Sequence, residues 1–256
     1  MDYRESDYGF CMRARVKLEF ARERGIENYY YILQNENKYY KVIEMLEDDE
    51  SKKTFIEVVR SLIENDIYRY NEYSSELKYF DNQIYKSLGK NEVWINCGSC
   101  LGDTILHYLI GRKKFKKIYA VEIDTKMIEH LVKMIELFPE NIKEKIIVVD
   151  KFLQGKKGDY SIDNLFESEK ITLINMDIEG FELTVLDGAR YKIKTDNPVL
   201  SVAAYHRPSD LLVIPEFLKK INNDYRFFFR KYRGYSPEVL NEYIYYAVPS
   251  ERIVQK

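Results

Sequence analysis

One stretch constrains the fold of this chain more than any other: residues 93–103, which read Val-Trp-Ile-Asn-Cys-Gly-Ser-Cys-Leu-Gly-Asp. Residues 93–96 are rich in β-branched and aromatic side chains and predict a buried strand, whereas residues 103–112 predict a helix. Gly98 and Gly102 permit close backbone approach and positive φ angles. A strand, a glycine loop and a helix start bring backbone N–H donors together, which predicts a site for the polar part of a cofactor. A loop that merely turns the chain is the alternative.

The next predicted strand, residues 117–122, ends in the acid Glu122, twenty residues after Gly102. At this spacing an open α/β sheet places a carboxylate on the ribose diol of a nucleotide. The dinucleotide pattern G-x-G-x-x-G is absent, because the loop holds only Gly98 and Gly102. The sequence therefore favours a nucleoside without a pyrophosphate.

Strands and helices alternate from Glu92 onward. The predicted strands are residues 93–96, 117–122, 145–149, 171–177 and 199–205, and the predicted helices are residues 103–112, 125–138, 180–190 and 209–222. Such alternation indicates a mostly parallel sheet with right-handed crossovers. Residues 225–232 and 242–248 predict two more strands whose connection is too short for a crossover helix, so they must pair antiparallel at the sheet edge. Five parallel strands followed by a hairpin resemble the Rossmann-like α/β fold of class I S-adenosylmethionine methyltransferases.

The first 90 residues read as a helical extension without a catalytic cluster. Apolar residues recur at helical spacing in three segments, residues 14–24, 29–46 and 54–65. Ser51 is a candidate cap for the third helix, and the acidic run 47–50 favours a solvated loop over a metal site. We expect a helical N-terminal extension over residues 1–90 and a cofactor-binding domain over residues 91–256. Whether the extension covers the sheet, mediates dimerisation or closes over a ligand stays open.

Composition and charge exclude several classes of function. A formal net charge of −2 argues against a general nucleic-acid binder, which would carry a basic excess. No apolar run approaches the roughly 18 residues of a membrane span, and residues 1–5 do not open a signal peptide. Three cysteines in 256 residues indicate reduced thiols, and no second C-x-x-C completes a zinc site. We therefore expect a cytoplasmic protein with no nucleic-acid partner and no membrane span.

The segment after the fourth predicted strand carries the most specific motif. Residues 174–182 read Ile-Asn-Met-Asp-Ile-Glu-Gly-Phe-Glu, and residues 185–189 read Val-Leu-Asp-Gly-Ala. Together they resemble the K-x-D-x-E-G-x-E…L-x-G-A signature of the FkbM family of methyltransferases. Further similarity to this family or to one bacterial branch of it lies in residues 46–55, 79–80, 161–165, 205–215 and 225–249.

This resemblance implies an S-adenosylmethionine-dependent O-methyltransferase that acts on a hydroxyl of a sugar, glycan or related metabolite. The partner is then a small-molecule or glycan acceptor, and a homodimer is left open. Together with the loop pattern, the resemblance implies that eight residues bind S-adenosylmethionine, which are Asn96, Gly98, Ser99, Gly102, Asp103, Glu122, Ile123 and Asp150.

Asp177, Glu179 and His206 are the predicted catalytic residues, because they lie at the carboxyl ends of the fourth and fifth strands, at the crevice where a doubly wound sheet binds ligands. A sulfonium methyl is an activated electrophile, so the protein mainly aligns an acceptor oxygen and helps to remove its proton. The alternatives are structural: Asp177 as a helix cap, Glu179 at the helix dipole and His206 as a buried structural histidine. No metal site is predicted, although an ion between Asp177 and Glu179 is left open.

Two departures from the family pattern motivate other functions. The family opens its loop with aspartate where this chain has Asn96, and residues 151–160 are too few for a hairpin that relatives carry. The adenine side of the pocket is then either more open or completed by the N-terminal helices, and a catalytically weak or inactive cofactor-binding module is one alternative. A thiol redox protein is another, since Cys97 and Cys100 form a C-x-x-C at a strand-to-helix turn.

Overall fold

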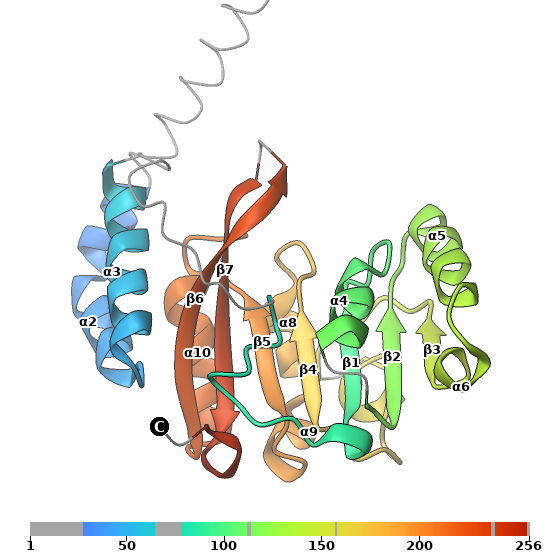
Figure 1. Cartoon of the computed structure of the whole chain (residues 1–256). Coiled ribbons are helices and arrows are strands. Elements are labelled where there is room, and N and C mark those ends of the chain that lie inside the picture. Colours follow the sequence, from blue (N-terminus) through green and yellow to red (C-terminus); the bar gives the residue numbers. More distant parts are fainter. Residues whose placement is uncertain (1–27, 65–77, 112–113, 157, 237–238, 255–256) are drawn as a thin grey trace, which may run out of the picture.

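A mostly parallel sheet runs through the computed structural model, which describes residues 28–64, 78–111, 114–156, 158–236 and 239–254 (Figure 1). Its strands are β1 (Val93–Cys97), β2 (Lys117–Val121), β3 (Ile146–Val149), β4 (Leu173–Met176), β5 (Val199–Ala203), β6 (Tyr225–Ser236) and β7 (Val239–Pro249). They lie in the order β3-β2-β1-β4-β5-β7-β6. Strands β1 to β5 are parallel, and β7 pairs antiparallel with both β5 and β6. The predicted α/β sheet of five parallel strands and a C-terminal hairpin is therefore confirmed.

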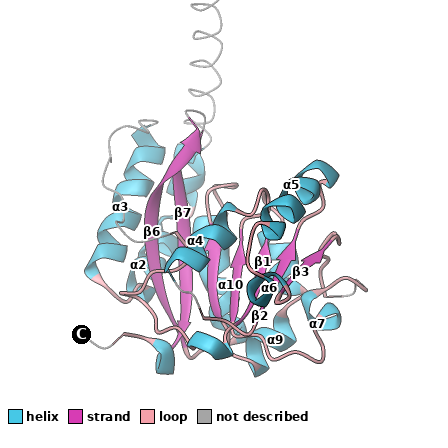
Figure 2. Cartoon of the chain, turned by 45° about the vertical axis from the view of Figure 1, so that its right-hand side comes forward, coloured by secondary structure: helices cyan, strands magenta, loops and turns pink. Residues whose placement is uncertain are grey.

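Helices cover both faces of this sheet (Figure 2). They are α2 (Glu36–Met45), α3 (Asp49–Glu64), α4 (Asp103–Gly111), α5 (Thr125–Glu136), α6 (Glu140–Lys143), α7 (Ile162–Leu165), α8 (Glu182–Asp187), α9 (Arg190–Thr195) and α10 (Asp210–Ile221). Side chains alternate between the faces of a strand, so Ile95 and Trp94 enter different cores. The first core contains α2, α3 and α8 to α10, and the second contains α4, α5 and the segment 79–85.

The strand order reverses between β1 and β4. The chain proceeds outward from β1 to β2 and β3, then returns to place β4 on the other side of β1. The crossovers that leave β1 and β4 therefore depart in opposite directions and open a crevice at the carboxyl ends of these two strands. Both the glycine loop after β1 and the acidic motif after β4 lie at this reversal point.

The N-terminal helices differ from their predicted bounds. The predicted helix 14–24 lies outside the described residues, and the predicted helix 29–46 is interrupted by a turn at Asn35. Helix α3 begins at Asp49 because the Asp48 carboxylate accepts the Ser51 N–H at 2.9 Å, which makes Asp48 the cap. The prediction of Ser51 as the cap is therefore wrong. The predicted solvated loop 47–50 is correct only in part, because Glu47, Asp49 and Glu50 are exposed but Asp49 and Glu50 already belong to the first turn of α3.

A buried arginine joins this N-terminal part to the sheet. Arg230 of β6 is 3% exposed and contacts both carboxylate oxygens of Asp48, at 2.7 and 3.2 Å. Ser51 Oγ accepts hydrogen bonds from Arg230 Nη1 and from the Phe229 N–H, at 2.7 and 2.9 Å. Helices α2 and α3 thus lie beside β6, at the opposite end of the sheet from β2 and β3 (Figure 1). Those two helices do not complete the adenine side of a pocket at β1, and the domain boundary near residue 90 stays a prediction.

The segments after β4 and β5 also depart from prediction. Strands β4 and β5 end at Met176 and Ala203, so Asp177 and His206 lie in the loops that follow. The predicted helix 180–190 is the shorter α8, which ends at Asp187. Helix α9 begins only at Arg190, and neither the rest of α9 nor the short helices α6 and α7 were predicted. In the described part of the chain, no helix combines the length and apolarity needed to cross a membrane.

Candidate active site

The loop after β1 is shaped by its contacts with neighbouring strands. The N–H groups of Gly98 and Ser99 both donate to the Val121 carbonyl of β2, at 3.1 and 3.0 Å. Gly98 has a φ of 82°, and a Cβ there would lie 2.0 Å from the backbone oxygen of Asp177. Only glycine fits, because the chain leaving β4 passes directly against the loop.

A pocket of about 330 Å³ opens beside this loop, a volume at the lower end of the range for small-molecule sites. One wall contains Gly98, Cys100 and Glu122, and another contains Asp177 and Glu179. The rest of the lining is largely apolar, with Val121, Ile123, Met127, Phe152, Phe181 and Val185. The glycine loop and the acidic motif therefore share one largely apolar pocket.

Glu122 is held in place by the backbone. Its Oε2 accepts the Cys100 N–H at 2.8 Å, and its Oε1 accepts the N–H groups of Ile123 and Asp124, at 2.7 and 3.0 Å. A carboxylate offers about four lone-pair sites, so roughly one remains for a hydroxyl of a ligand. The carboxylate is thus preoriented at the pocket wall.

Three of the eight predicted cofactor residues line the pocket, namely Gly98, Glu122 and Ile123. The other five lie around it. Ser99 is fully buried and donates to the Asn96 carbonyl at 3.1 Å, while Gly102 packs against Met134 of α5. Asp103 begins α4, and Asp150 forms an exposed ion pair with Lys151 at 3.2 Å.

Asn96 belongs to a neutral network inside the sheet. Its Oδ1 accepts from Asn175 Nδ2 at 2.7 Å, and Asn175 Oδ1 accepts from the Trp94 indole N–H. Both asparagines are buried, and Asn96 Nδ2 has no hydrogen-bond partner among the described residues. An aspartate at position 96 would place an uncompensated charge in this network, which costs far more than a neutral amide. Asn96, at which the chain departs from the family pattern, therefore lies in the core and not on the pocket wall.

The two cysteines of the C-x-x-C differ in their surroundings. Cys97 is fully buried in β1, whereas Cys100 is exposed at the pocket, and both are free thiols. Burial raises the pKa of both thiols, and neighbouring carboxylates add to the effect. A redox-active cysteine requires the opposite, a lowered pKa that populates the thiolate. The site therefore offers no support for the thiol redox alternative.

Asp177 accepts hydrogen bonds from two phenols. Its carboxylate lies 2.5 Å from the Tyr79 hydroxyl and 2.8 Å from the Tyr205 hydroxyl. Lys78 Nζ lies 3.4 Å from Asp177 and also pairs with Glu242 of β7. Helix α8 begins only at Glu182, so the alternative of Asp177 as its cap is wrong. Lys78 was not anticipated from the sequence, and the resemblance at residues 79–80 was the only signal for this segment.

Two left-handed residues shape the turn between β4 and α8. Glu179 has a φ of 55° and Gly180 a φ of 90°. This turn directs the N–H groups of Ile178 and Gly180 onto Glu182 Oε1, at 2.9 and 3.4 Å. Backbone donors thus accommodate the buried Glu182 carboxylate, whereas the Glu179 side chain is 91% exposed.

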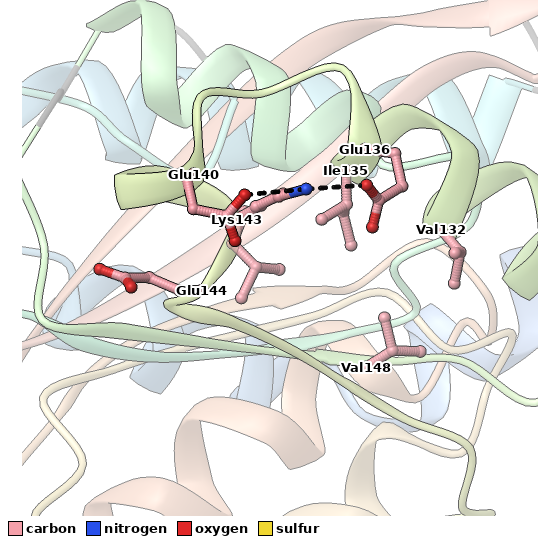
Figure 3. A pocket seen from close by; sticks show the side chains of 8 residues that line it. Val132, Ile135, Glu136, Glu140, Lys143, Glu144 and Val148 are labelled. Atoms are coloured by element: carbon pink, nitrogen blue, oxygen red, sulfur yellow. Dashed lines mark hydrogen bonds and ion pairs between the residues drawn. The ribbon is translucent and has the colours of Figure 1, made fainter.

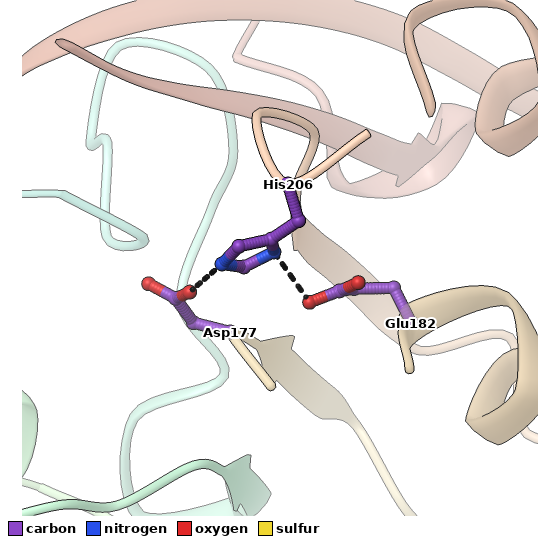
Figure 4. A group of neighbouring side chains, drawn as sticks. All are labelled: Asp177, Glu182 and His206. Atoms are coloured by element: carbon purple, nitrogen blue, oxygen red, sulfur yellow. Dashed lines mark ion pairs between the residues drawn. The ribbon is translucent and has the colours of Figure 1, made fainter. Parts of the chain in front are cut away.

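His206 lies between the carboxylates of Glu182 and Asp177 (Figure 4). Its Nδ1 is 2.9 Å from Glu182 Oε1, and its Nε2 is 3.5 Å from Asp177 Oδ1 and 3.6 Å from Glu179 Oε2. Burial lowers the pKa of His206, but these three carboxylates outweigh it and raise the pKa above its ordinary value.

These donors do not converge on a single metal ion. Ligand atoms of Asp177, Glu182 and His206 lie within 4.8 Å of one another. However, each ring nitrogen faces a different carboxylate, so the imidazole separates the two acids (Figure 4). The arrangement suits movement of a proton along a chain of groups better than coordination of a cation.

A second groove, beside β3, has a different character (Figure 3). Its volume is about 350 Å³, and Lys143 bridges Glu136 and Glu140 across it, at 2.9 and 3.1 Å. The groove lies outside the reversal point of the sheet, and its acids are exposed. We therefore assign the candidate active site to the pocket at β1 and β4.

Comparisons with known proteins show which family the chain belongs to. Residues 34–236 match the family model of the methyltransferase FkbM domain. The crystal structure of methyltransferase FkbM from Methylobacillus flagellatus KT is similar, with a TM-score of 0.74 and 25% identity, over 85% of this chain and 60% of that chain. This chain thus spans less than two thirds of that protein's length.

More distant likenesses are to a precorrin-6y C5,15-methyltransferase from Geobacter metallireducens GS-15 and to TrmK of M. capricolum in complex with S-adenosyl-homocysteine. Both are 14% identical, with TM-scores of 0.46 and 0.42. They cover 64% of this chain each, and 82% and 65% of their own chains. No curated protein matches the sequence. Because the family model covers most of its length, the chain belongs to the FkbM methyltransferase domain family.

Proposed function

We propose that this chain is an S-adenosylmethionine-dependent O-methyltransferase that acts on a hydroxyl of a sugar, a glycan or a related small metabolite. The observation that carries the proposal is one pocket lined by the glycine loop, by Glu122 and by Asp177. A cofactor held at the loop and Glu122 would place its reactive group within reach of Asp177. Membership of a methyltransferase family favours a methyl group as that reactive group.

The residues of the pocket fit the cofactor. Glu122 is preoriented by three backbone N–H groups and retains capacity for a ribose hydroxyl. Ile123, Phe152 and Phe181 offer apolar and aromatic surface for a nucleobase, with the two phenyl rings 5.3 Å apart edge to face. When bound, S-adenosylmethionine supplies a methyl group on a positively charged sulfur, and the acidic wall at Asp177 and Glu179 favours that charge electrostatically.

The acceptor hydroxyl is assigned to the group formed by Asp177, Glu179 and His206. Carboxylates and phenols bind hydroxyl groups well, and Tyr205 adds its hydroxyl 2.8 Å from Asp177. During transfer the acceptor oxygen attacks the methyl carbon and its O–H proton passes to a basic group of the protein. Two candidates are the Asp177 carboxylate, which lines the pocket, and His206 Nε2, which lies behind it, 3.5 Å from Asp177 Oδ1.

Calorimetry with S-adenosylmethionine and S-adenosylhomocysteine tests the cofactor assignment, together with native mass spectrometry of the freshly purified protein. We expect one nucleoside per chain. A lack of binding, or preferential binding of a nicotinamide dinucleotide, would overturn the proposal. Transfer from methyl-labelled cofactor to nucleotide sugars, free glycans and small polyols then identifies the acceptor.

A further inference from the structure

Glu182 is the most buried acid of the motif and is not part of the pocket wall. Its side chain is 2% exposed, and its Oε1 lies 2.9 Å from His206 Nδ1. The same oxygen accepts the backbone N–H groups of Ile178 and Gly180. A buried carboxylate with such fixed backbone donors has little freedom to move, so it can fix the position of whatever side chain it contacts.

The imidazole itself is held away from solvent with one nitrogen toward the acceptor wall. The His206 side chain is 9% exposed, and its ring packs 4.3 Å from that of Tyr205. With Nδ1 at Glu182, Nε2 is left facing Asp177 and Glu179. The ring is not aligned for linear hydrogen bonds within the described residues, and catalytic contacts are often this loose before a substrate binds.

We propose that Glu182 is a positioning residue that keeps the proton of neutral His206 on Nδ1 and thereby makes Nε2 the base for the acceptor hydroxyl. This inference rests on the proposed methyl transfer for its functional consequence, but the tautomer is a property of the protein alone. Glu182 itself touches neither cofactor nor acceptor, because it lies behind the ring.

The step balances as follows. The acceptor O–H bond breaks and its proton bonds to Nε2, while the acceptor oxygen bonds to the methyl carbon and the carbon–sulfur bond breaks. The electron pair of that bond stays on sulfur, which becomes a neutral thioether. The resulting imidazolium is stabilised by Glu182 on one side and Asp177 on the other, and it releases its proton to solvent as the products leave.

The charges around His206 come from several elements. Glu182 lies on α8, Asp177 and Glu179 lie in the β4–α8 connection, and Asp210 lies at the start of α10. Because the base must be neutral to accept a proton, methyl transfer should rise with pH through the raised pKa of His206. Removing the Glu182 charge should therefore shift this rise in the rate of methyl transfer to lower pH.

Nitrogen-15 NMR of the imidazoles tests the proposal without any acceptor. The chain has three histidines, so His206→Gln identifies the relevant signal. We expect the Nδ1–H tautomer in the wild type, and in Glu182→Gln a fall of about one unit in the pKa of His206, a tenfold change in proton affinity. Asp187→Asn makes the same charge change on α8, where Asp187 pairs with Arg190, and should leave the His206 signal unchanged.

Kinetics then link the tautomer to the reaction. Glu182→Gln should lower turnover by about 10²–10⁴ with little change in cofactor affinity, and Glu182→Asp should recover part of the raised pKa. An Nε2–H tautomer in the wild type, or a His206 pKa unaffected by Glu182→Gln in a folded protein, would overturn the positioning role whatever the activity. The expected tautomer and pKa change without methyl transfer to any acceptor would instead overturn the proposed function and leave the positioning of His206 standing.

Discussion

Replacing Glu122 with glutamine is the sharpest test of the cofactor pocket. In the wild type one oxygen accepts two backbone N–H groups, from Ile123 and Asp124, and the other accepts the Cys100 N–H. A glutamine oxygen can retain the first pair, but its amide NH₂ would then face the Cys100 N–H, donor against donor. The variant therefore loses the negative charge and one contact to the loop, while its shape is nearly unchanged.

The expected magnitude follows from the lost ligand contact. A hydrogen bond from a ribose hydroxyl to a charged acceptor contributes about 1.5–3 kcal/mol. The dissociation constant for S-adenosylmethionine should therefore rise by roughly 10- to 150-fold. The free energy of unfolding should fall much less, because this hydrogen bond between Cys100 and Glu122 is exposed.

Isothermal titration calorimetry on matched preparations measures this effect. Glu129→Gln is the control, since Glu129 is exposed on α5, the helix that contributes Met127 to the pocket, and the substitution removes the same charge. It should bind the cofactor as the wild type does. If Glu122→Gln binds within about threefold of the wild type, the carboxylate does not contact the ribose. If both variants weaken binding equally, the effect is a general one of charge.

Three further perturbations address the acceptor wall, the thiols and the N-terminal attachment. Asp177→Asn should lower turnover by about 10²–10⁴ while cofactor affinity stays near that of the wild type, and unchanged turnover would remove Asp177 from the chemistry. The Cys97→Ser, Cys100→Ser double variant should still transfer methyl groups. If the wild type reduces disulfide substrates catalytically and the double variant does not, the thiol redox alternative is favoured. Arg230→Met should lower the free energy of unfolding in urea by about 3 kcal/mol, because it leaves the Asp48 carboxylate without its bidentate partner. In the wild type, burial raises the pKa of Asp48, but the hydrogen bonds from Arg230 and Ser51 outweigh burial and lower the pKa below its ordinary value. The ionised Asp48 therefore stabilises the fold above its ordinary pKa, and this stabilisation is lost as pH falls through the lowered value. In Arg230→Met the loss should begin at higher pH.

The sheet was predictable from local patterns because its strands carry apolar runs with clear ends. Each parallel strand is followed by a turn or a helix start, and the short connection between β6 and β7 allows only antiparallel pairing. The helix ends were less predictable. Asp48, not Ser51, caps α3, because Ser51 Oγ is engaged by β6, a contact between residues distant in the sequence.

The candidate site was predictable only in part, for a similar reason. The rule that ligands bind at the carboxyl ends of parallel strands brought Asp177 and His206 to one edge of the sheet. No periodicity indicates that Lys78 and Tyr79, nearly a hundred residues earlier, return to contact Asp177. Asn96 shows the opposite case, since a position that the motif assigns to the cofactor belongs to a buried amide network.

The turn at Glu179 and Gly180 couples the two halves of the proposed site. Its left-handed backbone aims N–H groups at Glu182, which contacts His206, and the next residue, Phe181, forms part of the apolar pocket surface. A side chain at Gly180 would require a strained positive φ and would approach Arg207 Nε to 3.2 Å. A disturbance of this one turn would therefore reach both the imidazole and the nucleobase surface. If the turn is shared in this way, one substitution at Gly180 should impair both cofactor binding and the positioning of His206. If the two depended on separate parts of the chain, the substitution would impair only one of them.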